Sequence, residues 1–165
     1  MLKEKSNKDG IPDEDNVLLI ACYEKPYSET SLEMIKGTIK REKPTKIIIL
    51  KIIEVPEMKD KLDTRIGKKT KENFIDSVVK DKREKVDDYT EDVLKITDQI
   101  DIPTVVRMRK GGVIADEIVK DYEKMDVDHI IIHDNDRDLL DRLAKGKVKG
   151  EVEKRVDDEE ITALE

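Results

Sequence analysis

The residue types best suited to chemistry lie together in one short stretch, His133-Asp134-Asn135-Asp136. Imidazole and carboxylate groups bind divalent cations, so His133, Asp134 and Asp136 could hold a metal ion that bridges to a phosphate. Such a site would support phosphotransfer or hydrolysis, but the sequence contains no identifiable nucleophile. The same residues fit a solvated loop in which Asp and Asn cap the next helix. We favour the loop and predict neither a metal site nor a catalytic residue.

The other reactive residue types are isolated along the chain. Cys22 is the only cysteine; Glu24 would raise the pKa of its thiol, and we expect a small buried strand residue. His129 has no neighbour that completes a proton relay and is expected at the surface or at a sheet edge. Tyr23 could stack on a base or fill the space that a base would need, and the sequence does not separate these. Gly111-Gly112 indicates a turn with positive φ.

Composition narrows the possible functions. The chain has 165 residues, typical of one domain. Its net charge of −7 and its aromatic content of 3%, without Trp, argue against a nucleic-acid partner. One cysteine and two histidines exclude the usual structural zinc site. Apolar runs of about five residues are far shorter than the roughly 20 of a membrane helix. We therefore expect a cytoplasmic protein, with the thermophile-like abundance of Lys, Glu, Asp and Ile that favours ion-pair networks.

Apolar runs alternate with amphipathic segments after a polar tail at 1–16. Strands are predicted at 17–21, 47–53, 104–108, 127–132 and, shorter, at 161–164. Helices are predicted from Ser28 (with Ser28 or Thr30 as cap) to Pro44, over 70–100 and 113–125, and in short pieces at 139–143 and from 148. Unbroken apolar runs indicate strands buried on both faces. The domain, 17–165, is therefore predicted to be an α/β fold: a three-layer α/β/α sandwich with an open, mainly parallel five-stranded sheet.

Ligands of such sheets bind beyond the carboxyl ends of the strands, where the strand order reverses. The candidate positions follow each predicted strand in turn. They are residues 22–24, 52–53, 110–112 and 133–138.

Three segments in this order resemble the universal stress protein family: VLLIACYEKPYSETSLEMI, KIIILKIIE and GGVIADEIVKDYEKMDVDHIIIHDNDRDLLDRLAKGKVKGEV. The resemblance runs from about Val17 to Leu164. In the last segment, Asp128, Arg137 and Leu140-Asp141-Arg142-Leu143 are similar to the family pattern in type and spacing. The resemblance implies an adenine nucleotide alpha hydrolase-like, Rossmann-like fold. It also implies a homodimer joined by antiparallel pairing of the last strands, and a role in stress response or regulation.

The nucleotide-binding branch of that family carries G-x2-G-x9-G-[ST] after the fourth strand, where backbone N–H groups close on phosphates. In register, these positions are His133, Asp136, Gly146 and Lys147 here. The family's acidic residue that holds the ribose falls on Tyr23. The resemblance therefore implies a degenerate ATP-binding motif.

The negative charges of the same loop also oppose the binding of a nucleotide's phosphates. Asp136 is flanked by Asp134 and Asp138, and two like charges about 4 Å apart repel by roughly 4 kcal/mol at an effective dielectric near 20. Lys147 and Arg137 offset part of this repulsion.

We therefore predict a non-enzymatic, universal stress protein-like homodimer that binds no cofactor, nucleic acid or membrane. Its degenerate cleft would be formed by Tyr23, Ile52, His133, Asp136, Arg137, Gly146 and Lys147. The dimer would pair through Ile161–Leu164, because an unpaired sheet edge is a liability. The alternative is an ATP- or AMP-binding switch, or a slow ATPase, that uses Lys147, Arg137 and Gly146 in place of the missing donors.

Overall fold

The computed structural model describes residues 15–23, 26–55, 68–133, 152, 155–156 and 160–164. Strands and helices alternate along the chain, as predicted. Their bounds are β1 (Val17–Cys22), α1 (Glu29–Glu42), β2 (Lys46–Glu54), α3 (Lys68–Thr97), β3 (Thr104–Gly111), α4 (Ile114–Lys124), β4 (His129–His133) and β5 (Ile161–Leu164). Residues 1–14 of the predicted N-terminal tail and the predicted helix at 139–143 lie outside the described residues, as does almost all of the helix predicted from 148.

The strands form one parallel sheet in the order β3-β2-β1-β4-β5. The chain adds β2 and β3 on one side of β1 and then returns to add β4 and β5 on the other side. The strand order therefore reverses between β1 and β4, which places the expected ligand crevice beyond Cys22 and His133. The prediction of an open five-stranded parallel sheet is confirmed.

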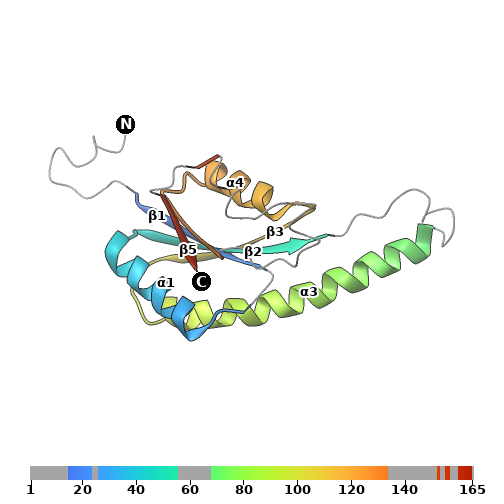
Figure 1. Cartoon of the computed structure of the whole chain (residues 1–165), viewed down its shortest axis with the longest axis horizontal. Coiled ribbons are helices and arrows are strands. Elements are labelled where there is room, and N and C mark those ends of the chain that lie inside the picture. Colours follow the sequence, from blue (N-terminus) through green and yellow to red (C-terminus); the bar gives the residue numbers. More distant parts are fainter. Residues whose placement is uncertain are drawn as a thin grey trace.

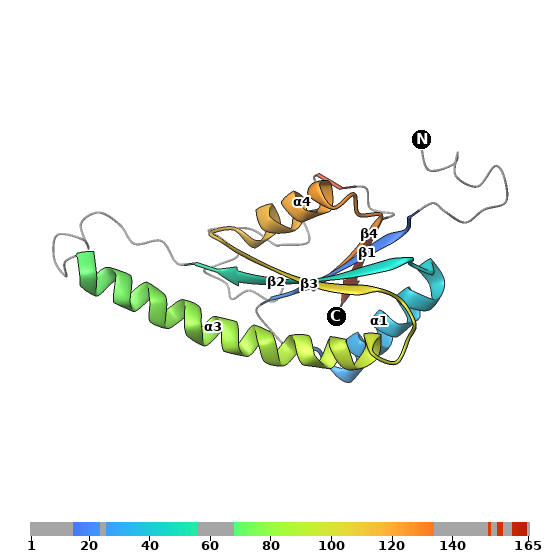
Figure 2. The ribbon, with the colours of Figure 1, turned by 180° about the vertical axis from the view of Figure 1, so that it is seen from behind.

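Helices cover both faces of the sheet. In Figures 1 and 2, α4 lies on one face, and α1 with α3 lies on the other. Successive residues of β1 serve the two faces in turn: Leu19 packs in the cluster on the α4 side, and Leu18 and Ile20 pack in the cluster on the side of α1 and α3. Because every residue of β1 is buried, its apolar run is that of a central parallel strand.

β3 departs from the prediction that each strand is buried on both faces. It lies at the edge of the sheet, and Val105, Val106 and Met108 are exposed, Val106 by 43%. An apolar run indicates a strand but not whether other strands pair with it on both sides. The pairing strands come from distant parts of the chain, so the local pattern could not show that β3 is an edge strand.

α3 is longer than the sheet that it covers. Val86, Val93 and Ile96 are buried against the sheet, which confirms the predicted packing for this half of the helix. The first half extends beyond the sheet (Figures 1 and 2), and Phe74 there is 52% exposed. The predicted apolar stripe is thus a core element along only part of the helix.

The ends of α1 follow local signals. Of the two predicted caps, Ser28 is the N-cap, and its Oγ accepts a hydrogen bond of 3.0 Å from the N–H of Ser31. Lys43 ends the helix in the left-handed conformation at φ 48°, and Pro44 prevents its continuation. Among the described residues, the structure contains no helix with the length and apolarity that a membrane crossing requires.

Candidate functional site

The structure places only part of the predicted cleft. Tyr23 directly follows β1, Ile52 lies near the carboxyl end of β2, and His133 is the last residue of β4. Asp136, Arg137, Gly146 and Lys147 lie outside the described residues, as does Asp134 of the disfavoured metal hypothesis. The structure therefore reports on the base of the cleft and not on the loop after β4.

The base of the cleft is closed by apolar packing. Tyr23 is 2% exposed and Ile52 1% exposed, and both belong to the cluster that also contains Ile114 and Val152. A tyrosine in this position occupies volume beside the sheet instead of offering an exposed ring or a carboxylate. Of the two interpretations left open by the sequence, the packing favours the one in which Tyr23 fills space.

Cys22 is a buried strand residue, as predicted. It is free and fully buried, and burial raises the pKa of its thiol to about 11 against a smaller opposing effect of a hydrogen bond with Tyr27. The hydroxyl of Tyr27 lies 3.0 Å from both the Cys22 Sγ and the Ala21 carbonyl oxygen. Burial therefore keeps the thiol protonated and unreactive.

His129 is not at the surface, so that prediction was wrong. It is 5% exposed because β4 is an inner strand, where this residue pairs with Leu18 of β1. Its Nε2 lies 2.7 Å from the Thr162 Oγ of β5, and its Nδ1 lies 3.8 Å from Glu42 Oε1 at the end of α1. Burial lowers the pKa of His129, with a further lowering by Arg41 against the opposite effects of Glu42 and Glu160. The residue joins three elements, with a hydroxyl beside one ring nitrogen and a carboxylate near the other.

A charged cluster between β3 and α4 was not foreseen. Asp121 is completely buried and receives hydrogen bonds from Arg107 Nε and Nη2 (2.8 and 3.1 Å) and from Arg109 Nε (2.6 Å). Arg109 and Lys120 also contact Glu117, at 3.4 and 3.2 Å. Burial alone would raise the pKa of Asp121, but the two guanidinium groups hold it below the ordinary value.

This cluster is a structural connection, because each of its carboxylates already has cationic partners. Two signals in the sequence could have revealed it. Arg107 and Arg109 are two apart on a strand, and Glu117 and Asp121 are four apart on a helix, so each pair lies on one side of its element.

Gly111 serves the same cluster. A Cβ at this position would lie 2.2 Å from Glu117 Oε2. The side chain of Glu117 thus occupies the space that a Cβ at Gly111 would need, and Gly111 itself does not adopt the positive φ predicted for the Gly111-Gly112 turn.

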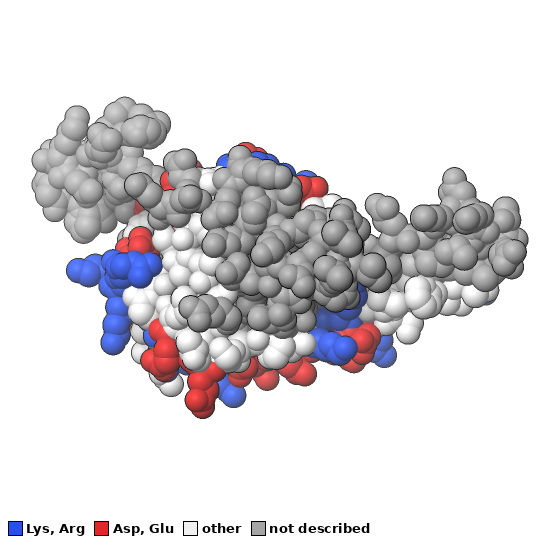
Figure 3. Space-filling view, viewed as in Figure 1, with Lys and Arg blue, Asp and Glu red and all other residues white. Residues whose placement is uncertain are grey.

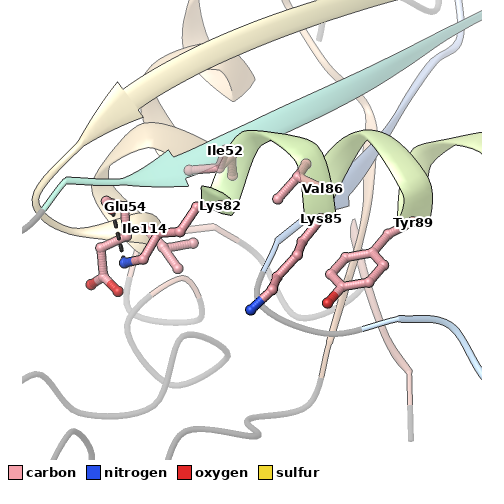
Figure 4. A pocket seen from close by; sticks show the side chains of 7 residues that line it. All are labelled: Ile52, Glu54, Lys82, Lys85, Val86, Tyr89 and Ile114. Carbon is pink, nitrogen blue, oxygen red and sulfur yellow. Dashed lines mark hydrogen bonds between the residues drawn. The ribbon is translucent and has the colours of Figure 1, made fainter. Parts of the chain in front are cut away.

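A pocket lies near the carboxyl end of β2 (Figure 4). Its volume is about 240 Å³, and it is lined by Ile52, Glu54, Lys82, Lys85, Val86, Tyr89 and Ile114. Only Ile52 was among the predicted site residues. The four residues from α3 are spaced i, i+3, i+4 and i+7, which is one face of a helix, and that spacing could have grouped them in advance.

Charges of both signs are mixed on the face shown in Figure 3, and its described residues present no broad patch of Lys and Arg alone. Within the described residues, no group of three or more His, Cys, Asp or Glu side chains could hold a metal ion.

Comparison with known proteins identifies the fold. No protein-family model matches the sequence, and no curated protein matches it significantly. Among solved structures, hypothetical protein MJ0577 is similar with a TM-score of 0.61 and 20% identity, over 90% of this chain and 94% of that chain. Universal stress protein UspA from Lactobacillus plantarum is similar with a TM-score of 0.64 and 9% identity, over 91% and 97% of the two chains. A universal stress protein from Burkholderia pseudomallei has a TM-score of 0.51 at 9% identity, over 90% and 95%. At these identities the likeness concerns the fold alone: over 91% of its length, the chain has the fold of a universal stress protein.

Proposed function

We propose that this chain is a non-enzymatic, cytoplasmic protein of the universal stress protein type, which acts in stress response or regulation without binding adenine nucleotides in the family's usual way. The observation that carries the proposal is the packing at the base of the cleft. Tyr23 stands where the family has the ribose-holding acid, and it lies within the apolar cluster at 2% exposure. A ribose hydroxyl would meet a packed ring there in place of a carboxylate.

The sequence of the loop after β4 supports the same proposal. His133 and Asp136 stand at two of the three glycine positions, and Lys147 stands at the hydroxyl position. Side chains at these positions oppose the close approach of backbone N–H groups to phosphates. The acidic residues of the loop add repulsion toward the phosphates.

A homodimer is part of the proposal. β5 lies at the edge of the sheet, where it pairs only with β4 among the described strands. A second copy that pairs with its outer edge would cover the exposed backbone groups. Light scattering at micromolar concentration tests this part, and a purely monomeric protein would reject it.

Calorimetric titration with ATP and with AMP, each with and without Mg²⁺, tests the nucleotide part. We expect no binding in the micromolar range and no release of phosphate from ATP above the rate in buffer. Micromolar binding that is lost in the variant Lys147→Glu would instead establish the alternative of a nucleotide-binding switch.

A restored motif provides the complementary test. The triple variant His133→Gly, Asp136→Gly, Lys147→Ser returns the family's residues to the loop, and Tyr23→Asp returns the acid. If the substitutions are what prevent binding, the combined variant gains affinity for ATP. If the unaltered chain and this variant bind ATP equally well, the substitutions are not the cause.

A further inference from the structure

The pocket beside β2 combines an apolar floor with cationic side chains. Ile52, Val86 and Ile114 come from three different elements, β2, α3 and α4. Ile52 and Ile114 are 1% exposed and Val86 is 4% exposed. These three side chains are held by the core and form the rigid apolar floor of the pocket.

The polar groups of the pocket point to one side. Figure 4 shows the ammonium groups of Lys82 and Lys85 and the hydroxyl of Tyr89 extending from α3 in the same direction. Lys82 Nζ donates a hydrogen bond of 3.0 Å to the Glu54 carbonyl oxygen, which positions the ammonium group. Lys85 Nζ lies 3.4 Å from Asp81 Oδ2. This ion pair is solvent-exposed, and exposed ion pairs contribute little energy.

The charges in the pocket favour an anion. Two ammonium groups face one carboxylate, that of Glu54, in a chain whose net charge is −7.

The size of the pocket limits the ligand. Pockets for larger organic ligands measure about 300 to 1,000 Å³, and this one measures about 240 Å³. We propose that it binds a small organic anion, with the apolar body on Ile52, Val86 and Ile114 and the anionic head between Lys82, Lys85 and Tyr89. This inference goes beyond the proposed function: the pocket shares Ile52 with the predicted cleft, but its cationic groups come from α3 and not from the loop after β4.

The test is a titration followed by methyl NMR. Phenyl phosphate and benzoate carry the same ring with different anionic heads, and inorganic phosphate is a head without a body. We expect phenyl phosphate to shift the methyl signals of Ile52, Val86 and Ile114 and to bind more tightly than inorganic phosphate. Benzoate then identifies the preferred anionic group. If benzoate binds as tightly as phenyl phosphate, a carboxylate suffices; if benzoate binds more weakly, the pocket prefers a phosphate.

Variants on α3 locate the site. Lys85→Glu is expected to weaken phenyl phosphate binding by about tenfold or more, whereas Lys85→Arg keeps the charge and the affinity. Lys80→Glu is the matched control, because Lys80 is an exposed residue of the same helix outside the pocket and the change in net charge is identical.

Three results would overturn the inference: unchanged methyl signals at saturating probe, equal binding of inorganic phosphate and phenyl phosphate, or equal loss in Lys80→Glu and Lys85→Glu. ATP binding that responds to Lys147→Glu and not to Lys85→Glu would contradict the proposed function and leave this pocket unaffected.

Discussion

Arg107 on the edge strand β3 and Asp121 on α4 form a two-point ion pair, with Nε 2.8 Å from Oδ2 and Nη2 3.1 Å from Oδ1. Asp121 is completely buried, so the pair connects the edge of the sheet to the helix that covers it. Parallel hydrogen bonds of this kind fix both distance and orientation.

Removal of the Asp121 charge should therefore be costly. In Asp121→Asn, the guanidinium groups of Arg107 and Arg109 lose their carboxylate in a buried site, and we expect the free energy of unfolding to fall by about 3–5 kcal/mol. Urea denaturation measures the loss. Asp116→Asn is the control, since its pair with Arg155 at 2.9 Å is solvent-exposed and should contribute less than about 1 kcal/mol. Similar losses in the two variants would show that burial does not strengthen the connection.

Acidification should destabilise the protein through His129. Its pKa in the folded protein lies below 6.5, so at intermediate pH the unfolded chain binds a proton that the folded chain does not. Stability is therefore fully present above pH 6.5 and is lost as the pH falls toward the folded pKa. We expect the pH dependence of the unfolding free energy in this range to decrease in His129→Gln. An unchanged pH dependence in His129→Gln would refute the assignment.

The Cys22 thiol should resist modification in the native protein. With a pKa near 11 and complete burial, it is almost entirely protonated and inaccessible at pH 8. We expect a disulfide reagent such as Ellman's reagent to react stoichiometrically only after denaturation. Tyr27→Phe removes the hydroxyl beside Cys22 Sγ and the Ala21 carbonyl and should lower stability by about 1–3 kcal/mol. Rapid modification of the native wild-type protein would contradict this description.

Two glycines should respond oppositely to alanine. Gly111→Ala places a Cβ 2.2 Å from Glu117 Oε2, and Glu117 is held by Arg109 and Lys120, so we expect a loss of about 1–3 kcal/mol. Gly37 lies within α1 with no atom near the new Cβ, and Gly37→Ala should stabilise the protein by about 0.5–1 kcal/mol. Thermal unfolding of both variants measures the difference.

A double variant tests the cause assigned to Gly111. If the clash with Glu117 is responsible, Gly111→Ala should cost less in a Glu117→Ala background than in the wild type. An equal loss of stability in both backgrounds would instead attribute the effect to the backbone conformation at Gly111.

The structure describes only part of the predicted site, whereas it describes all five strands of the predicted sheet. Tyr23 and Ile52 do lie together at the base of the crevice, because the carboxyl ends of neighbouring parallel strands meet there. The lysines that give the nearby pocket its charge come from α3, where their spacing places them on one face of the helix with Val86. Only the tertiary packing decides that this face lies beside the end of β2.

The sequence by itself determined the alternation of strands and helices, since the apolar runs, the Ser28 cap and Pro44 act over a few residues of chain. Only the tertiary structure decided that β3 is an edge strand, that His129 is buried, and that Arg107 and Arg109 share Asp121. Each of these properties depends on a neighbour from a distant part of the chain, and the local pattern of side chains carries no record of that neighbour.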